Sequence, residues 1–180
     1  MKDEREEYLA KLKKMYAPSF DLTEDAASGE WIFPLYGHFN VDNSGYVLSK
    51  KAKLWEANCQ EHLFVLTDTP EAPFESQMLT RLDHWLRETA EPTYVRKGET
   101  LPPKDHMYTY LTIVLVTDCG IDAAAAQFVK KYRFEKSYRF QLRGYLKTRM
   151  AIVSTKERTV VTNQSGKSLV NNYYKLLRQF

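Results

Sequence analysis

The chain has 180 residues, of which 43% are hydrophobic and 27% are charged, and it contains two cysteines. This much apolar material excludes a largely disordered chain, and two cysteines exclude a disulfide framework. The charged amino terminus excludes a secretory signal, and no apolar run approaches the roughly 20 residues that a membrane-spanning helix needs. We therefore expect a single α+β domain over residues 1–180, with reduced cysteines, a cytoplasmic location and no membrane partner.

The net charge of +3 conceals two halves of opposite sign. Residues 1–90 carry 10 Lys and Arg against 16 Asp and Glu, a net charge of −6, whereas residues 91–180 carry 16 against 7, a net charge of +9. A basic half joined to an acidic half indicates an anionic partner for the basic side. The alternative is that the two halves fold against each other and their charges interleave.

The first 30 residues predict a helix followed by a loop. Residues 3–16 begin with acidic side chains and end with lysines, an order that complements the helix dipole. Their apolar side chains recur at spacings of three and four, which places on one stripe Tyr8, Leu9, Leu12, Met15 and Tyr16. Residues 17–30 are polar and predict a loop.

A meander of strands is predicted next. Alternating apolar and polar side chains indicate a strand over residues 35–41, and the turn-forming sequence of residues 42–45 follows it. A second strand is expected over residues 46–56. The apolar run of residues 61–67 predicts a third, buried strand.

The middle of the chain predicts a helix, a long loop and a central strand. Asp68, Thr69 and Pro70 have the residue types that begin a helix. The buried stripe of that helix is expected to consist of Phe74, Met78, Leu82, Trp85 and Leu86. Residues 90–106 contain three prolines and no periodicity, so they predict a loop. Residues 107–117 carry apolar side chains on both faces and predict a central strand.

The last third predicts a short helix, a long strand and a closing helix. Asp122 is expected to cap the short helix. Unbroken alternation predicts one strand over residues 138–152, with a return strand over 159–162 and a helix from about Ser165.

Taken in chain order, these elements predict an α+β fold with the order α-β-β-β-α-β-α-β-β-α. About five to six strands are expected to form a mixed, largely antiparallel sheet, with three to four helices packed on at least one face. The sequence lacks a dinucleotide-binding fingerprint, a nucleophile elbow, a zinc-protease motif and a calcium loop. We therefore expect no cofactor and no metal site.

A basic stripe is the strongest functional signal. On a strand over residues 138–152, alternate side chains lie about 6.6–6.8 Å apart on one surface, so the arginines and lysines of this segment would line up with Tyr145 among them. Arg and Lys bind phosphate, and tyrosine can stack on a base. The candidate ligand-binding residues, including three from the preceding helix end, are Arg139, Arg143, Tyr145, Lys147, Arg149, Lys130, Lys131 and Arg133.

These residues favour a non-catalytic binding domain over an enzyme. Its partner would be a nucleic acid, another phosphate-bearing ligand or an acidic protein surface. The alternative for the same residues is a solvated sheet face whose arginine and lysine stems cover apolar surface. A structural or homodimeric module is a further alternative, because a long exposed strand can pair with its twin.

A nuclease-like enzyme is the main rival. The order helix, three strands, helix, strand over residues 3–117 is similar to the core of PD-(D/E)xK nucleases, a resemblance of topology alone. Such enzymes hold Mg²⁺ with paired carboxylates and use a lysine from an E-x-K or D-x-K triplet, which is absent from the predicted strands. The carboxylates nearest to the required places are Asp42, Glu56, Glu61 and Asp68.

The cysteines suggest two other kinds of site. Cys59 and His62 have a C-x-x-H spacing that His38 could join, but a zinc site usually needs three or four ligands. Cys119 follows the central strand and precedes a helix, where a thiol can become a nucleophile. Packing roles are the favoured reading of both cysteines.

Overall fold

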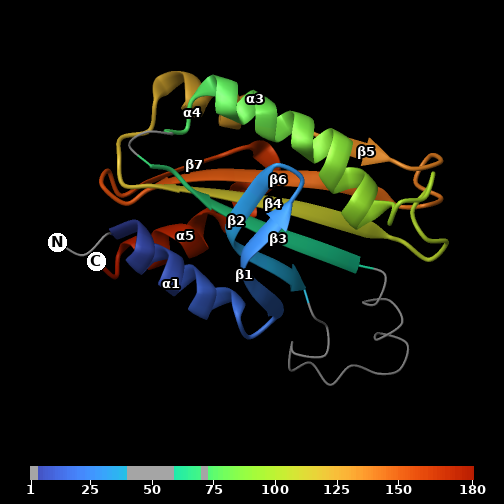
Figure 1. The fold of residues 1–180 in the computed structure, drawn as a ribbon, viewed down its shortest axis with the longest axis horizontal. Helices are drawn as coiled ribbons and strands as arrows, with labels where there is room; N and C mark the ends of the chain where they lie inside the picture. The colour runs from blue at the N-terminus through green and yellow to red at the C-terminus, as the bar shows by residue number, and fades with distance from the viewer. Residues whose placement is uncertain (1–3, 40–58, 70–72) are drawn as a thin grey trace.

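The computed structural model describes residues 4–39, 59–69 and 73–180, and Figure 1 shows helices on both faces of one mixed sheet. In chain order the elements are α1 (Glu4–Tyr16), β1 (Phe20–Ser28), β2 (Trp31–Phe39), β3 (Cys59–Thr67), α3 (Ser76–Trp85), the π-helical η2 (Leu86–Val95), β4 (Tyr108–Thr117), α4 (Ala123–Lys131), β5 (Glu135–Ser137), β6 (Tyr145–Ser154), β7 (Thr159–Thr162), the 3-10 helix η3 (Gln164–Leu169) and α5 (Val170–Leu177). The predicted α+β class and the approximate element order are confirmed.

Seven strands of the described chain form the sheet, in the order β1-β2-β3-β4-β6-β5, with β7 paired to the second half of β6. The inner strands β3, β4 and β6 run parallel to one another. The pairs β1–β2, β2–β3, β5–β6 and β6–β7 are antiparallel. The sheet exceeds the five to six strands predicted, because β1 and the three-residue β5 form in segments without a clear strand pattern.

Two hydrophobic cores lie on opposite faces of the sheet. On one face, α3, η2 and α4 pack over inner-strand side chains such as Ile113 and Met150, and we call this the α3–α4 core. On the other face, α1 and α5 pack over neighbours such as Val114 and Val153, and we call this the α1–α5 core (Figure 1). The predicted central position of β4 is confirmed, since its successive residues belong to different cores.

The predicted loop over residues 17–30 is wrong, because β1 pairs antiparallel with β2 along most of that segment. β1 is an edge strand, and Phe20 is its one buried residue. A polar sequence suits such a strand, because charged edge residues face water and discourage pairing with other chains. β2 contains most of the strand predicted over 35–41, whereas the predicted turn and strand over 42–56 lie outside the described residues.

The helix predicted from Asp68 begins later, at Ser76. The Asp68 carboxylate instead accepts a 2.6 Å hydrogen bond from Thr117 Oγ1 beyond the end of β3. The predicted loop over 90–106 is wrong as far as Val95, because η2 continues the helix through Pro92. Burial of Val95 and its neighbours in the core outweighs the helix-breaking effect of proline here.

The strand predicted over residues 138–152 is wrong in its first half. β6 begins at Tyr145, and residues 138–144 form a turn, which we call the β5–β6 turn. Three consecutive residues from Arg139 have φ angles of 48°, 52° and 70°, which exclude an extended strand. From Tyr145 onward the alternation is confirmed, since the even-numbered side chains of β6 are buried and the odd-numbered ones up to Arg149 are half-buried.

The remaining elements of the last third agree with the prediction. The Asp122 side chain caps α4 by accepting a 2.9 Å hydrogen bond from the Ala125 backbone N–H. β7 occupies the predicted return strand, and η3 with α5 forms the predicted closing helix.

Candidate functional site

The fold separates the predicted basic residues into three places instead of one stripe. Tyr145, Lys147 and Arg149 lie on β6. Arg139 and Arg143 lie on the β5–β6 turn. The remaining three, at and beyond the end of α4, are Lys130, Lys131 and Arg133. The stripe is interrupted because the turn removes two of its arginines from the strand.

One half of a sheet face gathers tyrosines and cations, and we call it the tyrosine face. It consists of Tyr108, Tyr110, Tyr145, Lys147 and Arg149, all half-buried. Tyr108 pairs in register with Tyr145, and Tyr110 with Lys147, so neighbouring strands place these side chains together. The ring centroids of Tyr108 lie 5.1 Å from those of Tyr110 and 5.8 Å from those of Tyr145.

Strand alternation explains the position of the tyrosine face. Tyr110 and Val114 are separated by an even number of residues along β4, so their side chains lie on the same side of the sheet. α1 and α5 cover Val114 and the carboxyl-terminal half of this side. The tyrosine face is the amino-terminal half of the same side, where β4 and β6 begin.

Arg149 is held within the tyrosine face by its neighbours. Its guanidinium lies 3.6 Å from the centroid of the Tyr110 ring, and its Nη1 donates to Glu61 Oε1 at 3.0 Å. Thr112 Oγ1 donates to the same carboxylate oxygen at 2.9 Å. Arg149 therefore has most of its charge compensated and acts mainly to fix the Tyr110 ring.

Lys147 is the available cation of the tyrosine face. Within the described ranges it forms no ion pair, and its ammonium lies 5.6 Å from the centroid of the Tyr145 ring. Glu135 is its register partner across β5 and β6. The Glu135 carboxylate accepts hydrogen bonds from Arg133 at 2.8 Å and from Ser165 at 3.3 Å, and it attracts Lys147 only more weakly, through charge. The Lys147 ammonium can therefore meet an incoming anion.

Tyr108 and Tyr145 are neutral near physiological pH, because their pKa values are raised. Burial raises the pKa of Tyr145 to about 12, and a hydrogen bond with Tyr110 acts in the same direction. Burial also raises the pKa of Tyr108 well above its usual value, with a hydrogen bond to Cys59 contributing. Neutral phenol rings can stack and donate hydrogen bonds without adding negative charge.

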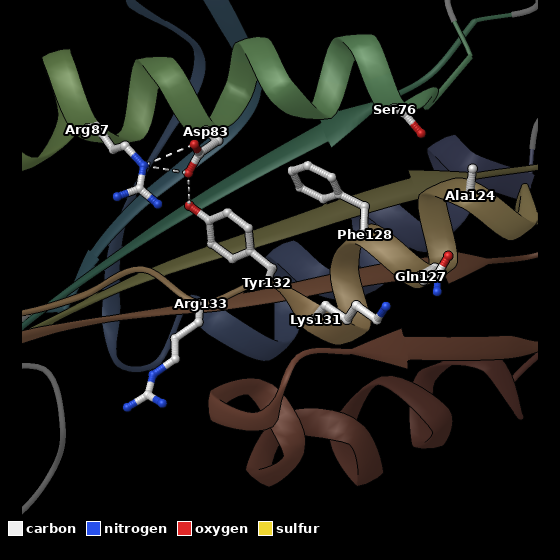
Figure 2. A pocket seen from close by; sticks show the side chains of 9 residues that line it. All are labelled: Ser76, Asp83, Arg87, Ala124, Gln127, Phe128, Lys131, Tyr132 and Arg133. Atoms are coloured by element: carbon white, nitrogen blue, oxygen red, sulfur yellow. Dashed lines mark hydrogen bonds and ion pairs between the residues drawn. The ribbon is translucent and has the colours of Figure 1, made fainter.

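Lys131 and Arg133 line a different site, a cleft of about 540 Å³ that we call the α3–α4 cleft. Figure 2 shows Tyr132 reaching from the end of α4 to Asp83 on α3, with Arg87 on the other side of that carboxylate. Asp83 accepts 2.8 Å and 2.9 Å hydrogen bonds from these two side chains, so its charge is compensated. In the described part of the chain, Lys131 forms no ion pair, and the cleft can accept a small anion.

His38 lies beside His62, as the C-x-x-H hypothesis allowed, on the paired strands β2 and β3. His38 and His62 stack with centroids 4.7 Å apart and an angle of 5° between their planes. Burial lowers the pKa of His62 to about 3, and His38 and Lys97 act in the same direction. His106 has other partners, since its Nδ1 lies 2.8 Å from the Arg143 carbonyl oxygen and its Nε2 lies 2.8 Å from Thr109 Oγ1. The contact between His38 and His62 depends on the register of β2 and β3, which places the two residues opposite each other.

The predicted C-x-x-H pair does not converge on one site. Cys59 and His62 differ by an odd number of positions along β3, so their side chains lie on opposite faces of the sheet. His62 Nδ1 lies 2.9 Å from the Tyr36 hydroxyl, whereas Cys59 is in register with Tyr108. Across residues 4–39, 59–69 and 73–180, no group of three or more His, Cys, Asp or Glu side chains could hold a metal ion.

The carboxylates of the nuclease-like prediction are also dispersed. Glu61 lies near the start of β3 and is paired with Arg149, whereas Asp68 follows the end of the same strand. Seven residues of extended chain span about 23 Å, so these two carboxylates cannot share one metal ion. Asp42 and Glu56 lie outside the described residues.

Cys119 has the electrostatics of an ordinary thiol. It is exposed after the end of β4, and its Sγ lies 3.6 Å from the Asp118 carboxylate. Desolvation and this carboxylate raise the pKa of Cys119, which opposes thiolate formation. An activated nucleophile needs a lowered pKa or an adjacent base.

Comparisons with known proteins place the chain in a family. No helix in the described ranges combines the length and the apolar composition that crossing a bilayer requires. Neither the curated proteins nor the solved structures include a significant match. The model of one protein family, the domain of unknown function DUF8052, matches residues 4–175. Because this match covers nearly the whole chain, the protein belongs to the DUF8052 family.

Proposed function

We propose that the protein is a non-catalytic binding module that takes up single-stranded nucleic acid on the tyrosine face. The observation that carries the proposal is the grouping of three tyrosine rings with Lys147 on one half of a sheet face. Aromatic rings on a sheet can stack on unpaired bases, and nearby cations can bind the backbone.

Each side chain of the tyrosine face has a distinct role in this proposal. Tyr108 and Tyr145, whose ring planes differ by 23°, offer the stacking surface. Lys147 contacts a phosphate. Arg149 fixes the Tyr110 ring, because its guanidinium lies 3.6 Å from the centroid of that ring. The rings favour nucleic acid over an acidic protein surface, because an acidic protein would need cations more than it needs π-faces.

We also propose that the protein is cytoplasmic. Cys59 and Cys119 are not joined in a disulfide, which suits a reducing compartment. The predicted homodimer required an unpaired edge on the long strand. β6 is paired with β4 on one side and with β5 and β7 on the other, so it offers no such edge. Light scattering would measure the assembly state.

Fluorescence anisotropy with labelled single-stranded RNA, single-stranded DNA and duplex DNA tests the proposal. We expect tighter binding of the single strands and a loss of affinity of about 3-fold between about 50 and 200 mM salt, which corresponds to the one phosphate contact at Lys147. The change Lys147→Glu should abolish binding at the higher salt. Absence of binding to any single strand at low salt would exclude the proposal.

Lys131→Glu is the matched control, because it makes the same charge change in the α3–α4 cleft on the other side of the sheet. We expect this variant to bind nearly as tightly as the unmodified protein. The opposite pattern, with Lys131→Glu inactive and Lys147→Glu unaffected, would transfer the anion site to the cleft. The cleft is the second candidate, since its volume of about 540 Å³ suits a small phosphate-bearing ligand.

A further inference from the structure

The β5–β6 turn exposes two large apolar side chains. Phe140 is 98% exposed and Leu142 is 80% exposed, more than any other large hydrophobic residue in the described chain. Single exposed hydrophobic residues are common on protein surfaces. Two at the tip of one short turn, between two arginines, indicate a contact surface.

The turn has a defined shape that presents these side chains. The backbone N–H of Leu142 donates to the Arg139 carbonyl at 3.0 Å, and that of Gly144 donates to the Gln141 carbonyl at 3.0 Å. Phe140 is the middle one of the three consecutive residues with left-handed backbone angles. Non-glycine residues adopt this conformation at an energetic cost, and such strain concentrates where a binding segment is shaped.

Side-chain hydrogen bonds anchor both ends of the turn. The Tyr138 hydroxyl donates to Glu91 Oε1 at 2.6 Å inside the α3–α4 core. The Arg143 Nη1 donates to the Pro102 carbonyl at 2.8 Å. The turn therefore presents Phe140 from a fixed base, which lowers the entropy lost when that side chain binds a ligand.

The turn itself is positively charged. Between Glu135 and Glu157 the chain contains no acidic residue, while the turn itself carries Arg139 and Arg143. In the described ranges Arg139 forms no ion pair, so its guanidinium can bind a phosphate.

The turn adjoins the tyrosine face. A cleft of about 390 Å³ lies between the turn and the segment before β4, and its lining includes Lys104, Asp105, Leu142 and Tyr145. Tyr145 also belongs to the tyrosine face and stacks with Tyr108. A strand bound on the tyrosine face would pass from Tyr145 directly to the turn.

We propose that the β5–β6 turn is a second contact point for the same single strand, with Phe140 stacking on an unpaired base and Arg139 binding the adjacent phosphate. This inference rests on the proposed function and extends the site beyond the sheet. An unpaired base suits the exposed ring, because its π-face is accessible, whereas the stacked bases of a duplex offer none along the helix.

Substitutions at Phe140 test the turn without disturbing the core, since the side chain is 98% exposed. We expect Phe140→Ala to weaken single-strand binding about 5- to 150-fold, the measured range for loss of one stacked base. Phe140→Leu should weaken binding similarly, because it keeps apolar volume but has no ring. Phe140→Trp should retain binding, and the oligonucleotide should quench its fluorescence more strongly than that of the unmodified protein, which has three tryptophans. Circular dichroism would confirm that each variant is folded.

Three outcomes would overturn the inference. If Phe140→Ala binds normally while Lys147→Glu does not, the turn lies outside the site and the proposed function stands. If Phe140→Leu binds like the unmodified protein, the contact is apolar burial and not stacking. If the tryptophan of Phe140→Trp responds to vesicles of anionic phospholipid and not to oligonucleotides, the turn contacts a lipid surface. Failure of the unmodified protein to bind any single strand would instead refute the proposed function itself.

Discussion

On the sheet face that α1 and α5 cover in part, the two halves of β4 and β6 carry different kinds of side chain. Along β4 and β6 the carboxyl-terminal half carries Val114 and Val153, which are fully buried under α1 and α5. The amino-terminal half carries the half-buried side chains of the tyrosine face. The border lies at the ion pair between Glu61 and Arg149, next to Tyr16 at the end of α1.

Stability and ligand binding are therefore expected to depend on different halves of the same strands. Side chains in the covered half contribute apolar burial, which is the main favourable term in folding. Side chains in the tyrosine face remain accessible, and their rings and cations can contact a ligand. Substitutions in the two halves should therefore affect different measurements, and four predictions test that separation.

The largest effect is expected in the covered half. Leu63 is fully buried in the α1–α5 core, so Leu63→Ala should lower the free energy of unfolding by about 2–5 kcal/mol. Urea unfolding followed by tryptophan fluorescence would measure the change. Lys147→Ala is the control from the tyrosine face and should change stability by less than about 0.5 kcal/mol. Equal losses for the two variants would contradict the separation.

Gly144 connects the turn to the tyrosine face and should not tolerate a side chain. Its φ angle is 76°, and an added Cβ would lie 2.2 Å from the Met107 carbonyl oxygen. Gly144→Ala should therefore lower the free energy of unfolding by at least about 2 kcal/mol, of which the left-handed backbone accounts for about 1–2 kcal/mol. Urea unfolding would test this. Gly98→Ala is the control, because its φ angle of 81° carries the same left-handed cost while its added Cβ has open space.

The pH dependence of stability should report on the buried His62. Its pKa falls from 6.5 to about 3 on folding, so the unfolded chain binds a proton that the folded chain does not. Stability is then fully present above pH 6.5 and is lost as the pH falls toward about 3, by about 2 kcal/mol at pH 4.5. Urea unfolding at pH 6.5 and pH 4.5 would measure the free energy of unfolding. This free energy should change less between the two pH values for His62→Gln than for the control His84→Gln.

The smallest effect is expected at the border of the two halves. Glu61→Gln removes the carboxylate charge that compensates Arg149. We expect single-strand binding to become about 2- to 10-fold tighter, the value of roughly one added charge-assisted contact. Anisotropy titrations would measure it. Weaker binding by Glu61→Gln would mean that Arg149 must stay paired to hold Tyr110.

Local patterns were sufficient for elements whose chemistry is local. The cap of α4 was predictable because Asp122 bonds to a backbone N–H only three residues away. The central position of β4 was predictable because a strand buried on both faces must be apolar on both. The pairing of Glu61 with Arg149, 88 residues apart, depends on a strand order that no local pattern contains.

The β5–β6 turn shows the limit of alternation as a signal. Phe140 and Leu142 continue the apolar alternation of β6, yet they are exposed. Alternation predicts a strand only where a core covers one side, and no residue between Tyr138 and Leu146 belongs to the core. The candidate site was therefore only partly predictable: Tyr145, Lys147 and Arg149 were identified, but their partners Tyr108 and Tyr110 were not.

The sequence by itself determined the fold class, the identity of the central strand and the excess of positive charge in the second half, because these depend on composition and on the period of side chains along one element. The tertiary structure alone decided which cations remain available and which are compensated. Compensation depends on distances of about 3 Å between residues on different strands, such as Arg149 and Glu61. Those distances arise only when β3, β4 and β6 align in register.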